Sequence, residues 1–230
     1  MKFIRKLIVF LIIILTLACS FLFLIGYGYY SNTLNEKPLT ERVEEITKKE
    51  HYTSFEKLPK NYINAVVATE DRRYYNHGPV DFIGIARAFY TNIRDKDFDE
   101  GGSTITQQVA KNVIFNQDKT LIRKVGEIFA SYDLEKNYSK DEILAIYANS
   151  CYFGNGYYSI YDASKGYYNK EPKDLNLNEA SMLAGVPNAP SLYAPTVNMN
   201  LAKKRQAHVL RKMVENGYIT QSEADSVTNP

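Results

Sequence analysis

Three polar side chains recur every fourth residue within the run GGSTITQQVAKN: Ser103, Gln107 and Lys111. In a helix this spacing places them on one face, with Thr104 and Gln108 beside them. Two glycines end just before Ser103, whose hydroxyl can cap the helix by accepting a backbone N–H. Hydroxyls, amides and an ammonium group at the start of a helix suit a ligand with sugar hydroxyls and phosphate. An ordinary amphipathic helix with a solvated polar face is the alternative.

A first carboxylate of interest is Glu70, which follows the apolar run 65–68 and precedes Asp71, Arg72 and Arg73. A carboxylate at the end of an apolar helix can be partly desolvated, whereas adjacent guanidinium groups favour its ionised form. Such a group can accept a proton from a weakly acidic hydroxyl that lies within reach. A surface cluster of salt bridges is the alternative.

A second carboxylate, Glu127, lies four residues after Arg123 and three after Lys124, so the three side chains share one helix face. Arg can grip phosphate with two hydrogen bonds and Lys supplies a point charge, so the pair suits the developing charge of a diphosphate leaving group. Glu127 can in addition hold a divalent metal that bridges phosphates. The alternative is a weakly stabilising surface ion pair.

The pattern beyond Leu58 is mainly helical. Helices are predicted over 120–138, 159–168, 178–184 and 201–215, and the capping box Ser139-x-x-Glu142 begins a further one. No long alternating pattern predicts a strand, so the fold class is mainly α.

An apolar stretch, Leu7–Ile25, contains no charged residue and matches the roughly 20 residues that cross a bilayer as a helix. Lys2, Arg5 and Lys6 precede it, which by the positive-inside rule predicts a cytoplasmic N-terminus. We expect a single-pass, uncleaved anchor with everything after Tyr30 outside the cytoplasm.

Composition excludes some classes of protein. Beyond the three basic residues of the N-terminus, 25 Lys and Arg face 26 Asp and Glu, without the basic stripe that nucleic-acid binding requires. The three His residues lack metal-ligand spacing, and Cys19 and Cys151 should lie in different environments and not pair.

Five segments resemble, in order, the signature motifs of the peptidoglycan glycosyltransferases. This family comprises monofunctional biosynthetic transglycosylases and the glycosyltransferase domains of class A penicillin-binding proteins. The resemblance covers roughly residues 58 to 215, and its segments are Asn61–Asp81 (NYINAVVATEDRRYYNHGPVD), GGSTITQQVAKN, Arg123–Glu127 (RKVGE), Asp141–Gly156 (DEILAIYANSCYFGNG) and Leu177–Pro195 (LNEASMLAGVPNAPSLYAP).

The resemblance implies an activity and a fold. It implies polymerisation of lipid II into glycan strands by inversion, with release of polyprenyl diphosphate, on a lysozyme-like domain at the cell membrane. Glu70 would be the general base that deprotonates the acceptor sugar 4-hydroxyl. Glu127 would be the second catalytic residue, with a divalent cation, Mg²⁺ or Mn²⁺, as its metal. Partners would be lipid II, the nascent glycan strand, the membrane and other cell-wall synthesis proteins, with no nucleic acid.

The motifs also imply substrate-binding residues. Asn149 lies in the fourth motif, although a loop Asn more often orders its own turn. The implied substrate-binding set is Asp71, Arg73, Ser103, Thr104, Gln107, Gln108, Lys111, Arg123, Lys124 and Asn149.

Between the first two motifs, Ile85, Phe89 and Ile93 repeat at helical spacing. The two interpretations are a core-facing helix and an apolar patch that enters the membrane, and the family resemblance favours the patch.

The expected division of the chain is therefore 1–6 cytoplasmic, 7–28 transmembrane, 29–57 stalk, 58–220 glycosyltransferase domain with a membrane-facing lobe at 82–100, and 221–230 C-terminal tail. Since the sequence ends at Pro230, we expect no transpeptidase domain within it; a natural short enzyme and a fragment of a bifunctional one both remain open.

Two other functions fit a pair of carboxylates in this setting. One is a lytic transglycosylase or lysozyme-type enzyme that cuts glycan strands. The other is a membrane-anchored cell-wall scaffold without catalysis. The cationic residues favour the transferase. Its leaving group would be a diphosphate, whose charge needs cations more than the alkoxide leaving group of a glycan-cleaving enzyme does.

Overall fold

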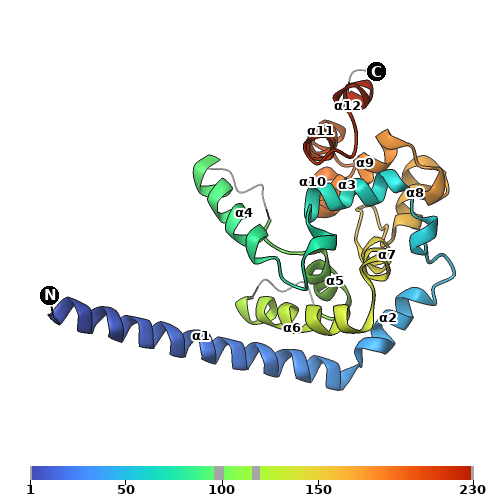
Figure 1. The fold of residues 1–230 in the computed structure, drawn as a ribbon. Helices are drawn as coiled ribbons and strands as arrows, with labels where there is room; N and C mark the ends of the chain where they lie inside the picture. Colours follow the sequence, from blue (N-terminus) through green and yellow to red (C-terminus); the bar gives the residue numbers. More distant parts are fainter. Residues whose placement is uncertain (1, 96–100, 116–119, 229–230) are drawn as a thin grey trace.

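The computed structural model describes residues 2–95, 101–115 and 120–228, which form helices and contain no strand (Figure 1). The predicted mainly α fold, with an apolar helix at its N-terminus, is confirmed. The α-helices are α1 (Lys2–Glu36), α2 (Leu39–Thr47), α3 (Lys60–Glu70), α4 (Phe82–Asp95), α5 (Ile105–Val113), α6 (Leu121–Asn137), α7 (Lys140–Ser150), α8 (Ile160–Tyr168), α9 (Leu177–Gly185), α10 (Pro190–Tyr193), α11 (Met199–Glu215) and α12 (Gln221–Thr228). Short 3₁₀ turns lie at Phe55–Lys57, Tyr74–Asn76, Pro172–Asp174 and Val186–Asn188.

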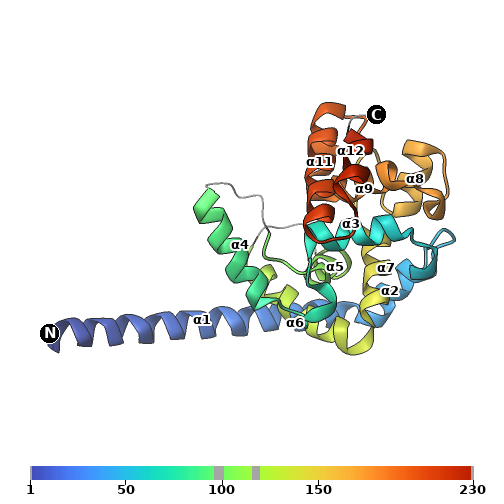
Figure 2. The ribbon, with the colours of Figure 1, turned by 45° about the horizontal axis from the view of Figure 1, so that its top comes forward.

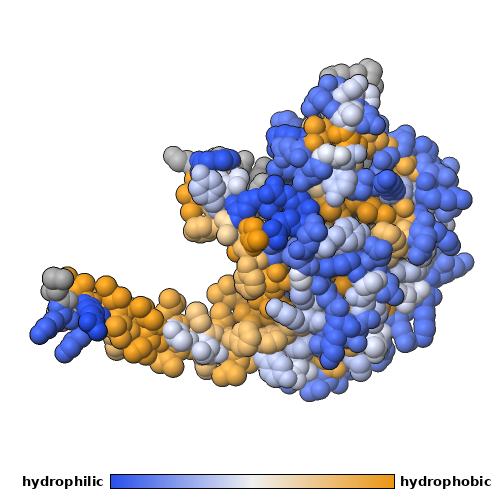
Figure 3. Space-filling view, viewed as in Figure 1, coloured by the Kyte–Doolittle hydropathy of each residue, from blue (hydrophilic) through white to orange (hydrophobic). Residues whose placement is uncertain are grey.

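Helix α1 is one unbroken helix that is long and apolar enough to cross a bilayer. Its N-terminal half projects away from the body in both ribbon views (Figures 1 and 2), and beyond the basic residues at its tip the side chains there are mostly exposed and apolar (Figure 3). Exposed apolar surface of this extent is unfavourable in water. The protein is therefore membrane-anchored through α1.

The C-terminal half of α1 packs along α6. The ring of Phe129 lies 4.6 Å from that of Phe23 and 5.2 Å from that of Tyr27. Gly26 brings the two backbones together, because a Cβ at this position would overlap Val125. The C-terminal half of the anchor helix is thus packed into the folded body.

The predicted stalk at residues 29–57 is not a separate segment. Tyr30 is buried on α6, where its hydroxyl donates to Asp133. Leu39, Val43 and Ile46 bury one face of α2 in the core. Their spacing is that of an amphipathic helix, whose apolar face outweighs the polar composition of the segment.

The predicted C-terminal tail is also largely structured. Helix α12 occupies 221–228 and buries Ala224 against the body, while residues 229–230 lie outside the described residues.

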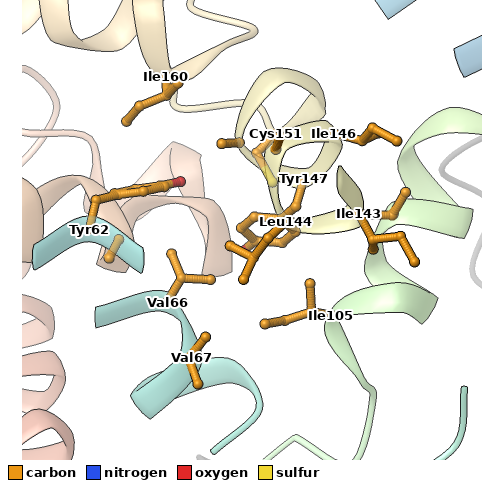
Figure 4. Packing of buried hydrophobic residues seen from close by; sticks show 14 of the residues in the cluster. Tyr62, Val66, Val67, Ile105, Ile143, Leu144, Ile146, Tyr147, Cys151 and Ile160 are labelled. Carbon is orange, nitrogen blue, oxygen red and sulfur yellow. The ribbon is translucent and has the colours of Figure 1, made fainter. Parts of the chain in front are cut away.

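The core of the domain gathers around α7. Its side chains Leu144 and Tyr147 are fully buried against Val66 of α3 and Ile105 of α5 (Figure 4). The predicted capping box begins α7, with Ser139 accepting from the backbone of Glu142 and the Glu142 side chain accepting in return. This packing holds α3 and α5 at a fixed separation, with α6 on the other side of α5.

The other predicted helices are present with small shifts at their ends. Thr120 caps α6 and Ser159 caps α8. Helix α11 begins two residues before its predicted start because Asn198 accepts the N–H of Leu201 as its cap. Helix α9 likewise starts earlier than predicted, at a capping box between Asn176 and Glu179.

Helix α4 stands apart from the body, on the side from which α1 projects (Figures 1 and 2). Phe89 is 69% exposed and Ile93 62% exposed, and Phe82, Ile83 and Tyr90 are exposed as well. This apolar face is therefore not core-facing, and the membrane-facing lobe stays a prediction. The part of the predicted lobe at 96–100 lies outside the described residues.

We predict that Phe89→Asp and Ile93→Asp remove α4 from the bilayer without unfolding the protein. Exposed apolar side chains contribute little to the core, so Tm should change by no more than roughly 2 °C. Hydrogen exchange of the full chain in lipid vesicles should show faster exchange in 82–95. Leu192→Asp is the matched control, since Leu192 is exposed on α10. A large loss of Tm with unchanged exchange would instead place α4 in the core.

Candidate active site

A hydrophilic pocket of about 350 Å³ lies between the end of α3, the polar face of α5, and parts of α6 and α11. It brings Glu70 and Glu127 together, although they are far apart in the sequence. The polar side chains that line it are Thr69, Glu70, Arg72, Arg87, Ser103, Gln107, Gln108, Lys111, Arg123, Lys124, Glu127, Asn188, Arg205, His208, Lys212, Glu215 and Asn216.

Glu70 is the last residue of α3, so the helix delivers its carboxylate to the pocket while the preceding apolar residues are buried. Its partners come from other helices. Gln108 Nε2 of α5 donates to Glu70 Oε2 at 2.8 Å, and Arg205 Nη2 of α11 lies 3.5 Å from Oε1. The carboxylate side chain is 13% exposed, which leaves it accessible from the pocket.

Arg205 was missed by the sequence reasoning. It lies 135 residues from Glu70, so no local spacing joins the two. A signal was present nonetheless, because Arg205 falls on the buried face of α11 together with Ala202 and Val209. A charged residue on an apolar helix face requires a partner, and here Glu70 is that partner.

Asp71 and Arg73, which follow Glu70 in the sequence, do not line the pocket. Asp71 is buried, and its Oδ2 accepts the backbone N–H of Ile105 at 3.1 Å while its Oδ1 lies 2.7 Å from His77 Nε2. Arg73 pairs with Asp81 at 3.3 Å. Both residues hold the turn that follows α3 in this structure, and their predicted substrate-binding roles stay predictions.

The cap of α5 is Thr104, one residue later than predicted. Its hydroxyl accepts the backbone N–H of Gln107 at 3.1 Å, and Gln107 Oε1 accepts the N–H of Thr104 at 3.1 Å. The reason is visible in the sequence, because a capping box needs Gln or Glu three residues after the cap, and only Thr104 has one. Thr104 also donates to the carbonyl of Pro79 and does not line the pocket, whereas Gln107 does.

Ser103 does not cap α5, and its side chain faces α6 instead. Lys124 Nζ donates to its Oγ at 2.7 Å and to Glu127 Oε2 at 2.7 Å. Arg123 Nη1 donates to the other oxygen of Glu127. Glu127 and Arg123 are buried, so this is not the solvated ion pair considered as the alternative. The predicted shared helix face is confirmed, and it presents two cations to the pocket beside Lys111.

Groups that could hold a metal lie both outside and inside the pocket. Among the residues described, the group of three close ligand atoms belongs to Asp71, His77 and Asp81, outside the pocket and engaged in the contacts given above. Within the pocket, Glu127 fits an ion that arrives with the substrate, because Mg²⁺ is commonly held by one carboxylate plus phosphate oxygens and water. Lys124, whose side chain is 43% exposed, can leave Glu127 without burying its charge. Bound there, such an ion would help neutralise phosphate charge.

Asn149 lies elsewhere and is structural. It is 2% exposed, its Oδ1 accepts the N–H of Thr53 at 3.0 Å, and its Nδ2 donates to the carbonyls of Thr53 and Ala145, both at 2.8 Å. With these bonds made, the side chain fastens the segment before α3 to α7. These contacts are the structural role considered as the alternative, and the implied substrate contact stays a prediction.

His77 is held as a double donor. Its Nδ1 lies 2.5 Å from the carbonyl of Gly78, and its Nε2 faces the Asp71 carboxylate. Burial alone would lower the pKa of His77, but the hydrogen bond to Asp71, with help from Gly78, raises it above its ordinary value. The ring therefore braces Asp71, which in turn anchors the start of α5.

The described residues form a helical body with a membrane anchor and a pocket in which carboxylates lie among cations. A family model described as Transglycosylase matches residues 35–214. The chain belongs to this family, the peptidoglycan glycosyltransferases whose motifs it resembles. The match begins within the predicted stalk, in agreement with the packing of α2.

Individual relatives agree with the family match. The chain is 39% identical to penicillin-binding protein 1F of Bacillus subtilis over 96% of its length, and 44% identical to penicillin-binding protein 1A of Neisseria lactamica over 77%. It spans only 33% and 22% of those two proteins. It is also 44% identical to a Cupriavidus necator protein whose name describes a transglycosylase, over 76% of this chain and 75% of that one.

The raised pKa of His77 predicts a pH-dependent contribution to stability. The contribution is fully present below the ordinary His pKa, about 6.5, and is lost as pH rises through the higher folded-state pKa. The Tm difference between wild type and His77→Gln should therefore be on the order of a few degrees at pH 6 and should shrink toward pH 9. His51→Gln, which changes a ring stacked on Tyr161, is the control. A difference that is constant with pH would contradict the assignment.

Proposed function

We propose that this chain is a peptidoglycan glycosyltransferase that polymerises lipid II into glycan strands with release of polyprenyl diphosphate. The observation that carries the proposal is the meeting of Glu70 with the Arg123–Lys124–Glu127 cluster in one pocket. A proton acceptor and a cationic site for a leaving group are the two elements that transfer from a sugar diphosphate needs.

In the proposed reaction, Glu70 removes the proton of the acceptor sugar 4-hydroxyl. The hydroxyl oxygen attacks the anomeric carbon of the donor, and the bond from that carbon to the diphosphate oxygen breaks. The proton stays on Glu70, and the electron pair leaves with the diphosphate. A single displacement of this kind inverts the anomeric carbon. Gln108 and Arg205 orient the carboxylate for the transfer.

The leaving diphosphate would lie against Lys111, Arg123 and Lys124. Preorganised cations stabilise the charge that develops on it without the reorganisation that water requires. Glu127 holds Arg123 and Lys124 in place, so its main duty in this proposal is to position cations. Ser103 and Gln107 line the same wall and would bind sugar or phosphate oxygens.

We further propose that the N-terminus is cytoplasmic and the pocket extracytoplasmic. The basic residues Lys2, Arg5 and Lys6 before the apolar span support this orientation. The exposed apolar face of α4 lies on the side of the molecule from which α1 projects, which suits a substrate whose lipid tail stays in the bilayer. The nascent strand and other cell-wall synthesis proteins remain predicted partners.

Polymerisation of purified lipid II by the full chain tests the proposed function. Glu70→Gln should slow it by about 10²–10⁴-fold, as expected for loss of a general base, and Glu127→Gln should also slow it because two cations lose their partner. Glu179→Gln, which pairs with Lys170 outside the pocket, is the matched control. A near-normal rate for Glu70→Gln would falsify the assigned role.

The products separate the proposal from its alternatives. Soluble fragments released from sacculi would indicate a glycan-cleaving enzyme, and binding of lipid II without any product would indicate a scaffold.

A divalent cation is proposed to assist at Glu127. Chelation should lower the polymerisation rate, and Mg²⁺ or Mn²⁺ should restore it, because phosphate oxygens and one carboxylate form a complete set of ligands with water. Glu127→Gln should raise the metal concentration needed for half-maximal rate. A rate that is indifferent to chelation would remove the ion from the proposal.

A further inference from the structure

A second pocket, of about 530 Å³, lies outside the site described above and is not used by the proposed reaction. Its walls are the segment between α2 and α3, one residue of α8, and the residues around the turn at Pro172–Asp174. In both ribbon views these parts lie on the side of the body opposite to the projecting half of α1 (Figures 1 and 2). The second pocket is therefore remote from the part of the chain that enters the bilayer.

Ring-shaped side chains form much of the lining of this pocket. The rings of His51 and Tyr161 stack with their centroids 4.2 Å apart and 11° between their planes, and Tyr52 and Pro172 add further ring surface. Sites for small molecules are typically lined by such side chains, with a few polar groups that fix the orientation of the ligand. The lining suits a ligand that is itself built of rings, such as a sugar.

Contacts within the protein hold the walls of the second pocket in place. Thr53 is fastened to Asn149 of α7, because its N–H donates to Oδ1 at 3.0 Å and its carbonyl accepts from Nδ2 at 2.8 Å. Glu171 pairs with Lys165, whose Nζ lies 2.5 Å from Oε1 and 5.7 Å from the centre of the Tyr161 ring. The pocket is thus built by contacts that need no ligand.

The charged side chains of the lining favour an anion. Lys57 and Lys173 are exposed, and among the described residues neither forms an ion pair with a carboxylate. The charge of Glu171 is already matched by Lys165, which leaves the exposed Glu50 as the opposing carboxylate. Two ammonium groups beside ring surface would attract a carboxylate that is carried on a sugar.

We propose that the second pocket binds a short segment of acidic glycan, with sugar rings against Tyr52 and Tyr161 and carboxylates at Lys57 and Lys173. The choice of a cell-wall strand as that glycan rests on the proposed function, because a polymerase works beside strands of its own product. A lipid-linked ligand fits less well, since the pocket lies on the side away from the projecting half of α1. Binding there would hold the enzyme to the wall while the active pocket stays open to substrate.

Binding of a soluble fragment to the full chain in detergent tests this site without any turnover. The probe is a peptide-free tetrasaccharide of cell-wall glycan that keeps its carboxylates, titrated by calorimetry. Lys57→Gln and Lys173→Gln should each raise the dissociation constant about 3–10-fold, and Tyr161→Ala should raise it about tenfold. The two Lys variants change exposed side chains and keep the fold even if Tyr161→Ala does not. Lys136→Gln, at an exposed position of α6 outside the pocket, is the matched control.

Lys111→Gln distinguishes the two pockets. It should slow polymerisation of lipid II and leave binding of the tetrasaccharide unchanged, whereas Lys57→Gln should weaken the binding and leave the polymerisation rate unchanged. Loss of binding in Lys111→Gln would place the tetrasaccharide in the active pocket and overturn the proposal. A wild-type chain that binds the tetrasaccharide at Lys57 but does not polymerise lipid II would support the site and contradict the proposed function alone.

Two further probes test the chemistry of the ligand. Chitotetraose, which has sugar rings without carboxylates, should bind roughly tenfold more weakly than the acidic tetrasaccharide. Equal affinity for the two would overturn the role of the lysines, and equal affinity for an acidic cell-wall peptide without sugars would overturn a glycan ligand. A dissociation constant that is unchanged in both Lys57→Gln and Lys173→Gln would overturn the site.

Discussion

The bond from the backbone N–H of Ile105 to the buried carboxylate of Asp71 is the contact on which the site depends. It fixes the first turn of α5 against the turn that ends α3. Because Glu70 directly precedes Asp71, the same bond sets Glu70 opposite Gln108, one turn further along α5. A carboxylate that accepts a helix N-terminal N–H also interacts favourably with the helix dipole. Asp71 thereby serves the pocket without entering it.

A second constraint is the burial of Glu127. A buried carboxylate must be paired, and both of its oxygens are met by cations from the preceding turn of the same helix. Lys124 extends this pairing to Ser103, which ties α6 to the segment that begins α5. The same contacts therefore pair the buried charge of Glu127 and hold α6 against the start of α5, so the groups that face the pocket also fix its shape.

Local signals explain how much of this could be predicted from the sequence. The shared face of Arg123, Lys124 and Glu127 follows from helical spacing alone, and the cap at Ser139 from its capping box. Contacts between distant segments could not be read in this way. Arg205 reaches Glu70 across 135 residues, and Asn149 meets Thr53 across 96. The family resemblance predicted which residues belong to the site. It did not distinguish the residues that line the pocket from those that hold the neighbouring turns.

The anchor has a consequence for where the pocket sits. Helix α1 runs without a break from Lys2 to Glu36 and meets α6 at close range through Gly26. Its length therefore sets the distance between the bilayer and α6, the helix that carries Glu127. Each residue of an α-helix adds about 1.5 Å and turns the chain by about 100°. Lengthening the apolar span by a single residue would change both the height of the pocket above the lipid and the direction in which its mouth opens.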